Sequence, residues 1–128
     1  MNTAWEKFQL AILALTRSDA IKDRLTEAYR KYLAKVVEDE LPKELREDFR
    51  ALGRTLTRER PVLRGEDAFR ATIRKMSNDE ADQVAATVVL MFAAIPRSFA
   101  SPLRAATSAQ IVPLYGNETQ EYAAAAGG

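Results

Sequence analysis

The sequence predicts an all-α protein: a compact bundle of four to five helices followed by an extended C-terminal arm. Three observations predict this class. Apolar residues recur at three- and four-residue steps in five segments, helix-capping residues open several of them, and no segment alternates as a surface strand does. The chain of 128 residues fits one helical domain, expected at residues 1–96, with the arm at residues 97–128.

The first two helices are expected at residues 4–16 and 19–37. Thr3 and Glu6 form a capping box, in which the hydroxyl accepts a hydrogen bond from an amide and the carboxylate accepts one from the cap residue. Ser18 is the expected N-cap of the second helix, because its hydroxyl suits an otherwise unpaired amide.

The third helix is expected to begin near Pro42, a residue that suits the first helical position. The acidic run 38–40 is expected to open this helix, because carboxylates are favourable at a helix N-terminus. A loop is predicted at residues 58–65, where arginines surround a proline and a glycine.

Two further helices complete the predicted bundle. The fourth is short and is expected at residues 66–75. Ser77 and Glu80 form the clearest capping box of the chain and open the fifth, which Pro96 ends. The apolar spacing predicts one core containing Trp5, Phe8, Ile12, Leu25, Tyr29, Leu45, Phe49, Leu52, Phe69, Ile73, Val84, Val88 and Phe92.

The second half of the predicted fifth helix has little polar surface. Val89, Leu90 and Met91 turn away from the side that carries the predicted core residues. A helix that is apolar all round is either central in a bundle or covered by another chain. We therefore expect contact with a protein partner, or self-association, through this helix.

The C-terminal arm carries further apolar residues among Pro, Ser and Ala. They are Phe99, Leu103, Ile111, Val112, Leu114, Tyr115 and Tyr122. One interpretation is an extended segment that docks on its own domain or on a neighbour. The other is a loosely ordered end with incidental hydrophobic residues.

Composition limits the chemistry that this chain can perform. It contains no histidine and no cysteine, which removes the usual neutral-pH base, the thiolate nucleophile and most transition-metal and haem ligands. We expect no cofactor and no metal, and an enzyme is not favoured. The formal net charge of +1, the absence of cysteine and an N-terminus without a basic signal region predict a cytoplasmic protein with no membrane partner.

A row of arginines supports a different hypothesis. Arg46, Arg50 and Arg54 step by four along the third helix, and Arg58 and Arg64 follow in the loop. Such a row can bind phosphates. The simpler interpretation is a solvated helix face, either neutralised locally by an acid such as Glu47 or paired with the acids Asp79, Glu80 and Asp82.

Two stretches, LPKELREDF at residues 41–49 and KMSNDEA at residues 75–81, resemble small, uncharacterised helical proteins of bacteria. The resemblance covers roughly residues 1–95. It implies a bacterial, soluble, helical domain and no activity, cofactor or site.

From these features we expect a non-catalytic interaction or regulatory subunit of a bacterial cytoplasmic assembly. The expected contact residues are Val89, Leu90, Met91, Phe99, Leu103, Ile111, Val112, Leu114 and Tyr115. The alternative is a nucleic-acid-associated regulator that uses the arginines at positions 46, 50, 54, 58 and 64.

Overall fold

The computed structural model describes residues 3–99 and confirms the all-α class, because that part of the chain contains helices and no strand. Its α-helices are α1 (Ala4–Leu15), α2 (Ile21–Lys31), α3 (Lys43–Leu56), α4 (Ala68–Lys75) and α5 (Asn78–Ala94). Three short 3-10 turns are η1 (Leu33–Lys35), η2 (Glu38–Glu40) and η3 (Arg97–Phe99). The predicted arm therefore lies outside the described residues except for η3, which contacts α1.

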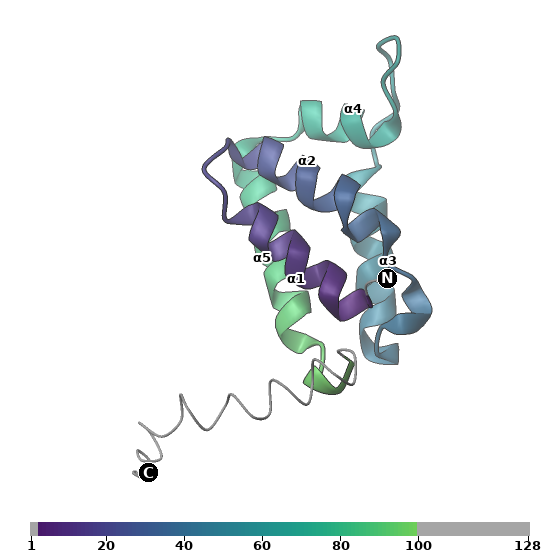
Figure 1. The fold of residues 1–128 in the computed structure, drawn as a ribbon. Coiled ribbons are helices and arrows are strands. Elements are labelled where there is room, and N and C mark those ends of the chain that lie inside the picture. The colour runs from purple at the N-terminus through teal and green to yellow at the C-terminus, as the bar shows by residue number, and fades with distance from the viewer. Residues whose placement is uncertain (1–2, 100–128) are drawn as a thin grey trace.

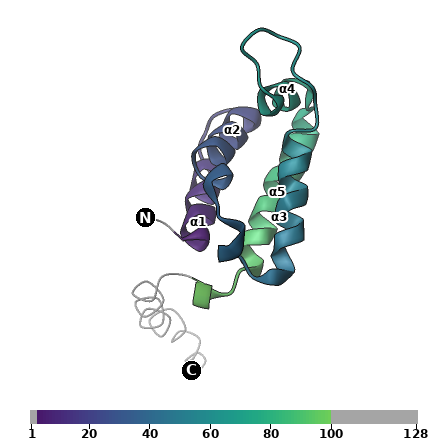
Figure 2. The same ribbon diagram turned by 90° about the vertical axis from the view of Figure 1, so that its right-hand side faces the viewer.

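The long helices form two layers. α1 and α2 pack against each other in one layer, and α3 and α5 lie side by side in the other (Figures 1 and 2). α5 contacts both α1 and α2 as well as α3, so it is the helix that joins the layers. α4 lies across one end of the bundle, and the segment that precedes it projects beyond that end (Figure 1).

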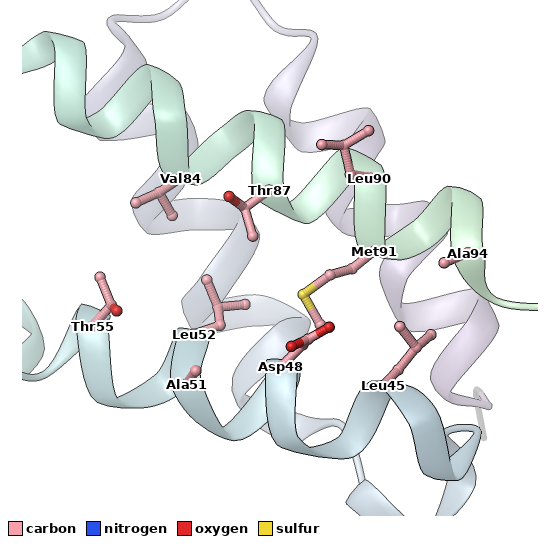
Figure 3. A pocket seen from close by; sticks show the side chains of 10 residues that line it. All are labelled: Leu45, Asp48, Ala51, Leu52, Thr55, Val84, Thr87, Leu90, Met91 and Ala94. Atoms are coloured by element: carbon pink, nitrogen blue, oxygen red, sulfur yellow. The ribbon is translucent and has the colours of Figure 1, made fainter.

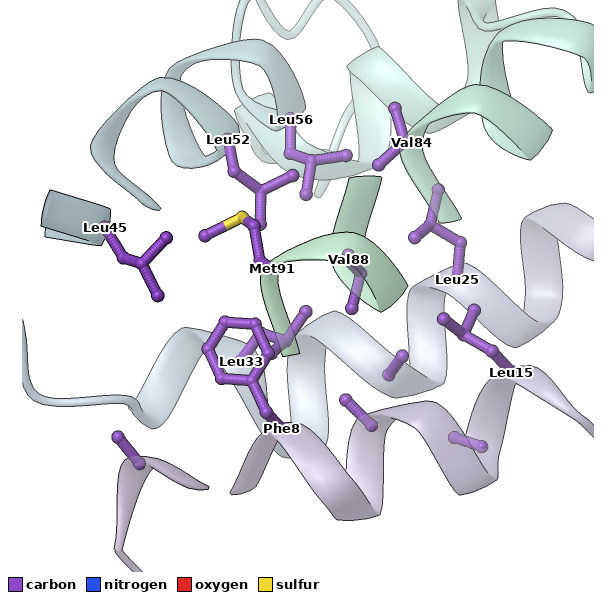
Figure 4. Close-up of a cluster of buried hydrophobic side chains, with 14 of the residues drawn as sticks. Phe8, Leu15, Leu25, Leu33, Leu45, Leu52, Leu56, Val84, Val88 and Met91 are labelled. Carbon is purple, nitrogen blue, oxygen red and sulfur yellow. The ribbon is translucent and has the colours of Figure 1, made fainter. Parts of the chain in front are cut away.

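The core lies between the two layers (Figure 4). Most of the residues predicted for it are buried, whereas Ile12, Tyr29, Phe49, Ile73 and Phe92 are only partly buried and pack against its edge. The largest fully enclosed apolar side chains are Phe8, Leu25, Leu33, Leu41, Leu56 and Val88. Eight of the thirteen predicted core residues are thus buried, and the other five lie at the edge of the core.

Aromatic pairs connect helices that are distant in the sequence. The rings of Trp5 and Phe92 lie 5.3 Å apart and join α1 to α5. Phe8 on α1 meets Phe49 on α3 at 6.1 Å. Tyr29 on α2 stacks on Phe69 of α4 at 4.9 Å. Tilted and stacked pairs at such separations add about 0.5–1.5 kcal/mol each beyond the area that they bury.

The second helix is shorter than its predicted range of residues 19–37. α2 ends at Lys31, and the backbone turns at Tyr32 (φ −125°) into η1. The prediction that Ser18 caps the helix is wrong, because the N-cap is Ala20 and it has no side-chain cap. Instead, Arg24 of the helix donates hydrogen bonds to the carbonyl oxygens of Asp19 (2.7 Å) and Leu15 (2.8 Å).

The acidic run at residues 38–40 does not open the third helix as predicted. It forms the separate turn η2, which ends where the Leu41 amide donates to the Glu38 carbonyl at 3.0 Å. Pro42 is the N-cap of α3 rather than its first helical residue, and its carbonyl accepts from Leu45. A proline carbonyl can begin a helix in this way even though the ring nitrogen has no hydrogen to donate.

The two remaining helices have side-chain caps. Asp67 caps α4 by accepting from the Arg70 amide at 2.9 Å, so this helix begins two residues later than predicted. The Ser77–Glu80 capping box is confirmed, with N–O distances of 3.0 and 3.4 Å. α5 ends at Ala94, because the extended backbone of Ile95 is the conformation that a following proline favours.

Replacing Phe8 by Ala is expected to lower the free energy of unfolding by about 3–5 kcal/mol, because its ring is completely buried among three helices. Leu13 lies on the same helix and is 57% exposed, so Leu13→Ala is the matched control and should change stability by about 0.5 kcal/mol or less. Urea unfolding followed by circular dichroism measures both. Equal midpoints for the two variants would contradict the burial of α1.

Ser77→Ala is expected to destabilise the fold by about 1 kcal/mol, because it removes the acceptor for the Glu80 amide. Ser18→Ala is the control, since Ser18 has no capping bond in the structure, and it should be neutral within about 0.5 kcal/mol. Thermal unfolding of the two variants distinguishes a cap that is used from one that the sequence only suggests. The reverse order of stabilities would refute this assignment.

Candidate functional site

An apolar groove of about 390 Å³ runs between α3 and α5 (Figure 3). Each helix contributes five side chains to it. From α3 they are Leu45, Asp48, Ala51, Leu52 and Thr55, and from α5 they are Val84, Thr87, Leu90, Met91 and Ala94. Leu45 and Ala94 lie at one end of the groove, and Thr55 and Val84 lie at the other (Figure 3).

Small side chains create this groove. Ala51 on α3 and Ala94 on α5 leave space where larger residues would close the contact between the helices. The floor consists of Leu52, Met91 and other side chains that also belong to the core. Leu90 stands at the rim and is 69% exposed, so the groove continues onto an apolar surface.

Asp48 is the only lining residue that carries a charge. Its carboxylate forms no hydrogen bond or ion pair with any residue in the described part of the chain. The hydroxyl of Thr87 is already used, because it donates to the carbonyl of Gln83 at 3.0 Å. An apolar cavity with one free carboxylate is suited to binding an apolar segment that carries a cation.

The structure separates the three residues predicted to turn outward from α5. Leu90 lines the groove, and Val89 is 44% exposed but lies outside it. Met91 does not turn outward as predicted, because it is 5% exposed and shares the buried stripe of Val84, Val88 and Ile95, although its side chain also lines the groove. The groove residues of α3 were not predicted, although Asp48 sits on the same helical stripe as two leucines and could have indicated them.

Of the predicted contact residues in the arm, only Phe99 is described, and it is 37% exposed at the end of η3. Outside the described residues lie Leu103, Ile111, Val112, Leu114 and Tyr115. The structure therefore assigns no position to these five.

The arginines of α3 are engaged by nearby oxygen atoms. Arg46 donates to the main-chain carbonyls of Leu41 (3.0 Å) and Asp39 (3.1 Å). Arg50 pairs with Glu38 and Glu47, and Arg54 pairs with Glu47 at 2.8 Å. The hydrogen bonds from Arg54 and Arg50 lower the pKa of Glu47, so this carboxylate stays ionised. Neutralisation by Glu47 was one of the interpretations that the sequence left open.

The two predicted arginines of the loop behave differently. Arg58 donates to Glu80 at 2.9 Å, and this bond together with the Ser77 amide lowers the pKa of Glu80. Arg64 has no ion-pair partner among the described residues. The five arginines thus do not present one free row of positive charge, because four of them already bind carboxylates or carbonyls.

Glu66 determines the shape of the segment that precedes α4. Its side chain is only 6% exposed and binds the Arg74 guanidinium through both oxygens, at 2.7 and 3.2 Å. The amides of Val62 and Leu63 also donate to it, at 3.2 Å each. These contacts, of which the Arg74 bond is the largest cause, lower the pKa of Glu66 to about 2.

Comparison of the chain with protein-family models, curated proteins and solved structures finds no match. Among residues 3–99, no helix is both long enough and apolar enough to cross a membrane. The same residues contain no group of three or more side chains arranged to hold a metal ion.

We expect the stabilising effect of Glu66 to depend on pH. Because folding lowers its pKa from 4.5 to about 2, the ionised form stabilises the fold above pH 4.5, and this stabilisation is lost as the pH falls toward 2. The difference in unfolding free energy between the wild type and Glu66→Gln should therefore shrink over that range. Urea unfolding at a series of pH values measures it, and Arg74→Met should show the same trend. A difference in unfolding free energy that stays constant over this pH range would contradict the stabilising role of the Glu66 contacts.

Proposed function

We propose that the protein is a non-catalytic interaction or regulatory subunit of a bacterial cytoplasmic assembly and that the α3–α5 groove is its docking site. The observation that carries this proposal is the continuity of the groove with Leu90, a leucine left 69% exposed. Apolar surfaces of this kind mark contact sites when they are concave and rimmed by polar residues. The bacterial cytoplasm is supported by the sequence resemblance and by a chain that contains no cysteine.

The occupant that fits this groove is an apolar segment of another protein that carries one Lys or Arg. Two parallel walls of helix provide a slot into which an amphipathic helix can lay its apolar face. Asp48 is charged and unpaired within residues 3–99, so a Lys or Arg on the bound segment would form an ion pair with its carboxylate. Charge complementarity of this kind sets the register of a partner more than it adds affinity.

The nucleic-acid alternative receives less support from the geometry. Phosphates would have to displace carboxylates that already bind Arg50, Arg54 and Arg58. Exposed pairs of this kind contribute only about 0–1 kcal/mol each, so replacing one carboxylate by a phosphate costs little. A bound nucleic acid would, however, have to make this replacement at each of these arginines. Arg64 is the one predicted arginine without a partner among the described residues.

The test compares two leucine variants. The tagged wild-type chain is purified from its native cell, the partner is identified by mass spectrometry, and the affinity of the purified pair is measured by calorimetry. Leu90→Glu is expected to weaken this affinity at least about tenfold, because it places a charge at the rim of an apolar contact. Leu13→Glu is the matched control, since Leu13 is similarly exposed but lies on α1, and it should bind as the wild type does. Equal affinities for all three chains, or no partner, would contradict the proposal.

The same purification also tests the alternative. Changing Arg46, Arg50 and Arg54 together to Gln should leave binding of the protein partner nearly unchanged. Recovery of a nucleic-acid complex that falls apart steeply with salt, and that this triple variant loses, would replace the proposed function by the alternative.

A further inference from the structure

The groove opens at the end of α5 from which the chain continues. Ala94 is the last residue of α5 and lines the groove, close to Leu45 of α3 (Figure 3). Pro96 and the turn η3 follow at once, and the description ends at Phe99. Because η3 contacts α1, the described chain ends at this end of the bundle, on the side of α1.

The rest of the chain is long enough to fill the groove. From Ala94 to Val84 the groove follows α5 for about 15 Å, at 1.5 Å per helical residue. An extended chain covers about 3.3 Å per residue, so roughly five residues cross this distance. Residues 100–128 exceed this requirement several times over.

The chemistry of that segment matches the groove. Its apolar side chains include Leu103, Ile111, Val112, Leu114 and Tyr115. Between Ser98 and Asn117 the only charged residue is Arg104, and the only charged residue of the groove is Asp48. The apolar run at residues 111–115 has the five residues that an extended chain needs to cross the groove.

We propose that residues 111–115 of the same chain occupy the α3–α5 groove, with their apolar side chains against Leu52 and Leu90. A segment tethered next to its site reaches an effective concentration in the millimolar range, which favours docking within one chain over exchange between copies. The inference rests on the proposed function, because it makes the segment a competitor that a partner protein must displace. Partner binding is thereby regulated by the C-terminal segment.

The absence of cysteine allows a direct test on the full-length chain. Leu90→Cys combined with Leu114→Cys introduces one pair of thiols, which a short bis-maleimide links at low protein concentration. Leu13→Cys with Leu114→Cys is the matched control, because Leu13 is exposed on α1 in the other layer. The expected result is an intramolecular product, identified by intact mass, that forms at least several-fold faster in the groove pair than in the control pair.

Each other outcome overturns the inference. A covalent dimer as the main product means that a second copy fills the groove. Equal linkage rates for the two cysteine pairs mean that the C-terminal segment does not bind the groove in preference to the rest of the surface. The apolar run gives an independent measurement: Ile111→Asp should slow the linkage of the groove pair, because it places a carboxylate in an apolar contact. A linkage rate that this change leaves unaltered would refute the assigned register.

The outcome also separates this inference from the proposed function. If the cysteines link but Leu90→Glu leaves partner affinity unchanged, the groove binds only the C-terminal segment of its own chain and the proposed function fails. If Leu90→Glu weakens partner binding but the cysteines do not link within one chain, the partner site stands and the C-terminal competitor is refuted.

Discussion

The central position of α5 is the constraint on which the rest of the structure depends. This helix contacts α1 and α2 on one side and α3 on another, and Val88 at its middle is completely buried. A helix with apolar residues on nearly every side needs such a position, because each uncovered side exposes hydrophobic surface to water. The packing buries one stripe of α5, formed by Ala81, Val84, Val88 and Met91, and leaves Val89 and Leu90 exposed. The groove lies where the cover is incomplete, between α5 and the alanine of α3 at position 51.

Electrostatics on the outer faces follow a local rule. Carboxylates and guanidinium groups pair with neighbours that the fold brings within reach, such as Arg30 with Asp67 and Arg58 with Glu80. These pairs are largely exposed and contribute little individually. Glu66 differs because its side chain is enclosed and bound by a guanidinium and two main-chain amides. Its position explains why the projecting segment before α4 has a defined shape although much of its surface faces water.

Sequence reasoning succeeded where the determining contact is local. The pairs Thr3–Glu6 and Ser77–Glu80 act within four residues, so the sequence is enough to predict them. The Ser18 prediction failed because α2 begins at Ile21 and has Ala20 as its N-cap, so Ser18 lies before the position from which a side chain could cap this helix. Helical spacing alone allows either Met91 or Phe92 to share the stripe of Val88. The choice depends on where the α1–α2 layer lies, and helical spacing gives no information about that position.

The candidate groove lay beyond sequence reasoning for the same reason. Its two walls are far apart in the chain, and only the packing of α3 beside α5 turns them into one surface. Leu90 was predicted as a contact residue from the apolar run of its own helix. Asp48 was not predicted, because a single acid in an apolar stripe looks like an ordinary exposed residue. Only the position of α5 beside α3 shows that it lines a groove.

The contact of Trp5 with Phe92 gives this protein an optical property. Trp5 is the only tryptophan, it is 8% exposed, and its ring lies against the C-terminal part of α5. All indole emission of the molecule therefore originates at the junction of the first and last long helices. Separation of these two helices would expose the indole to water. The wavelength of its fluorescence emission therefore reports whether α1 and α5 remain in contact.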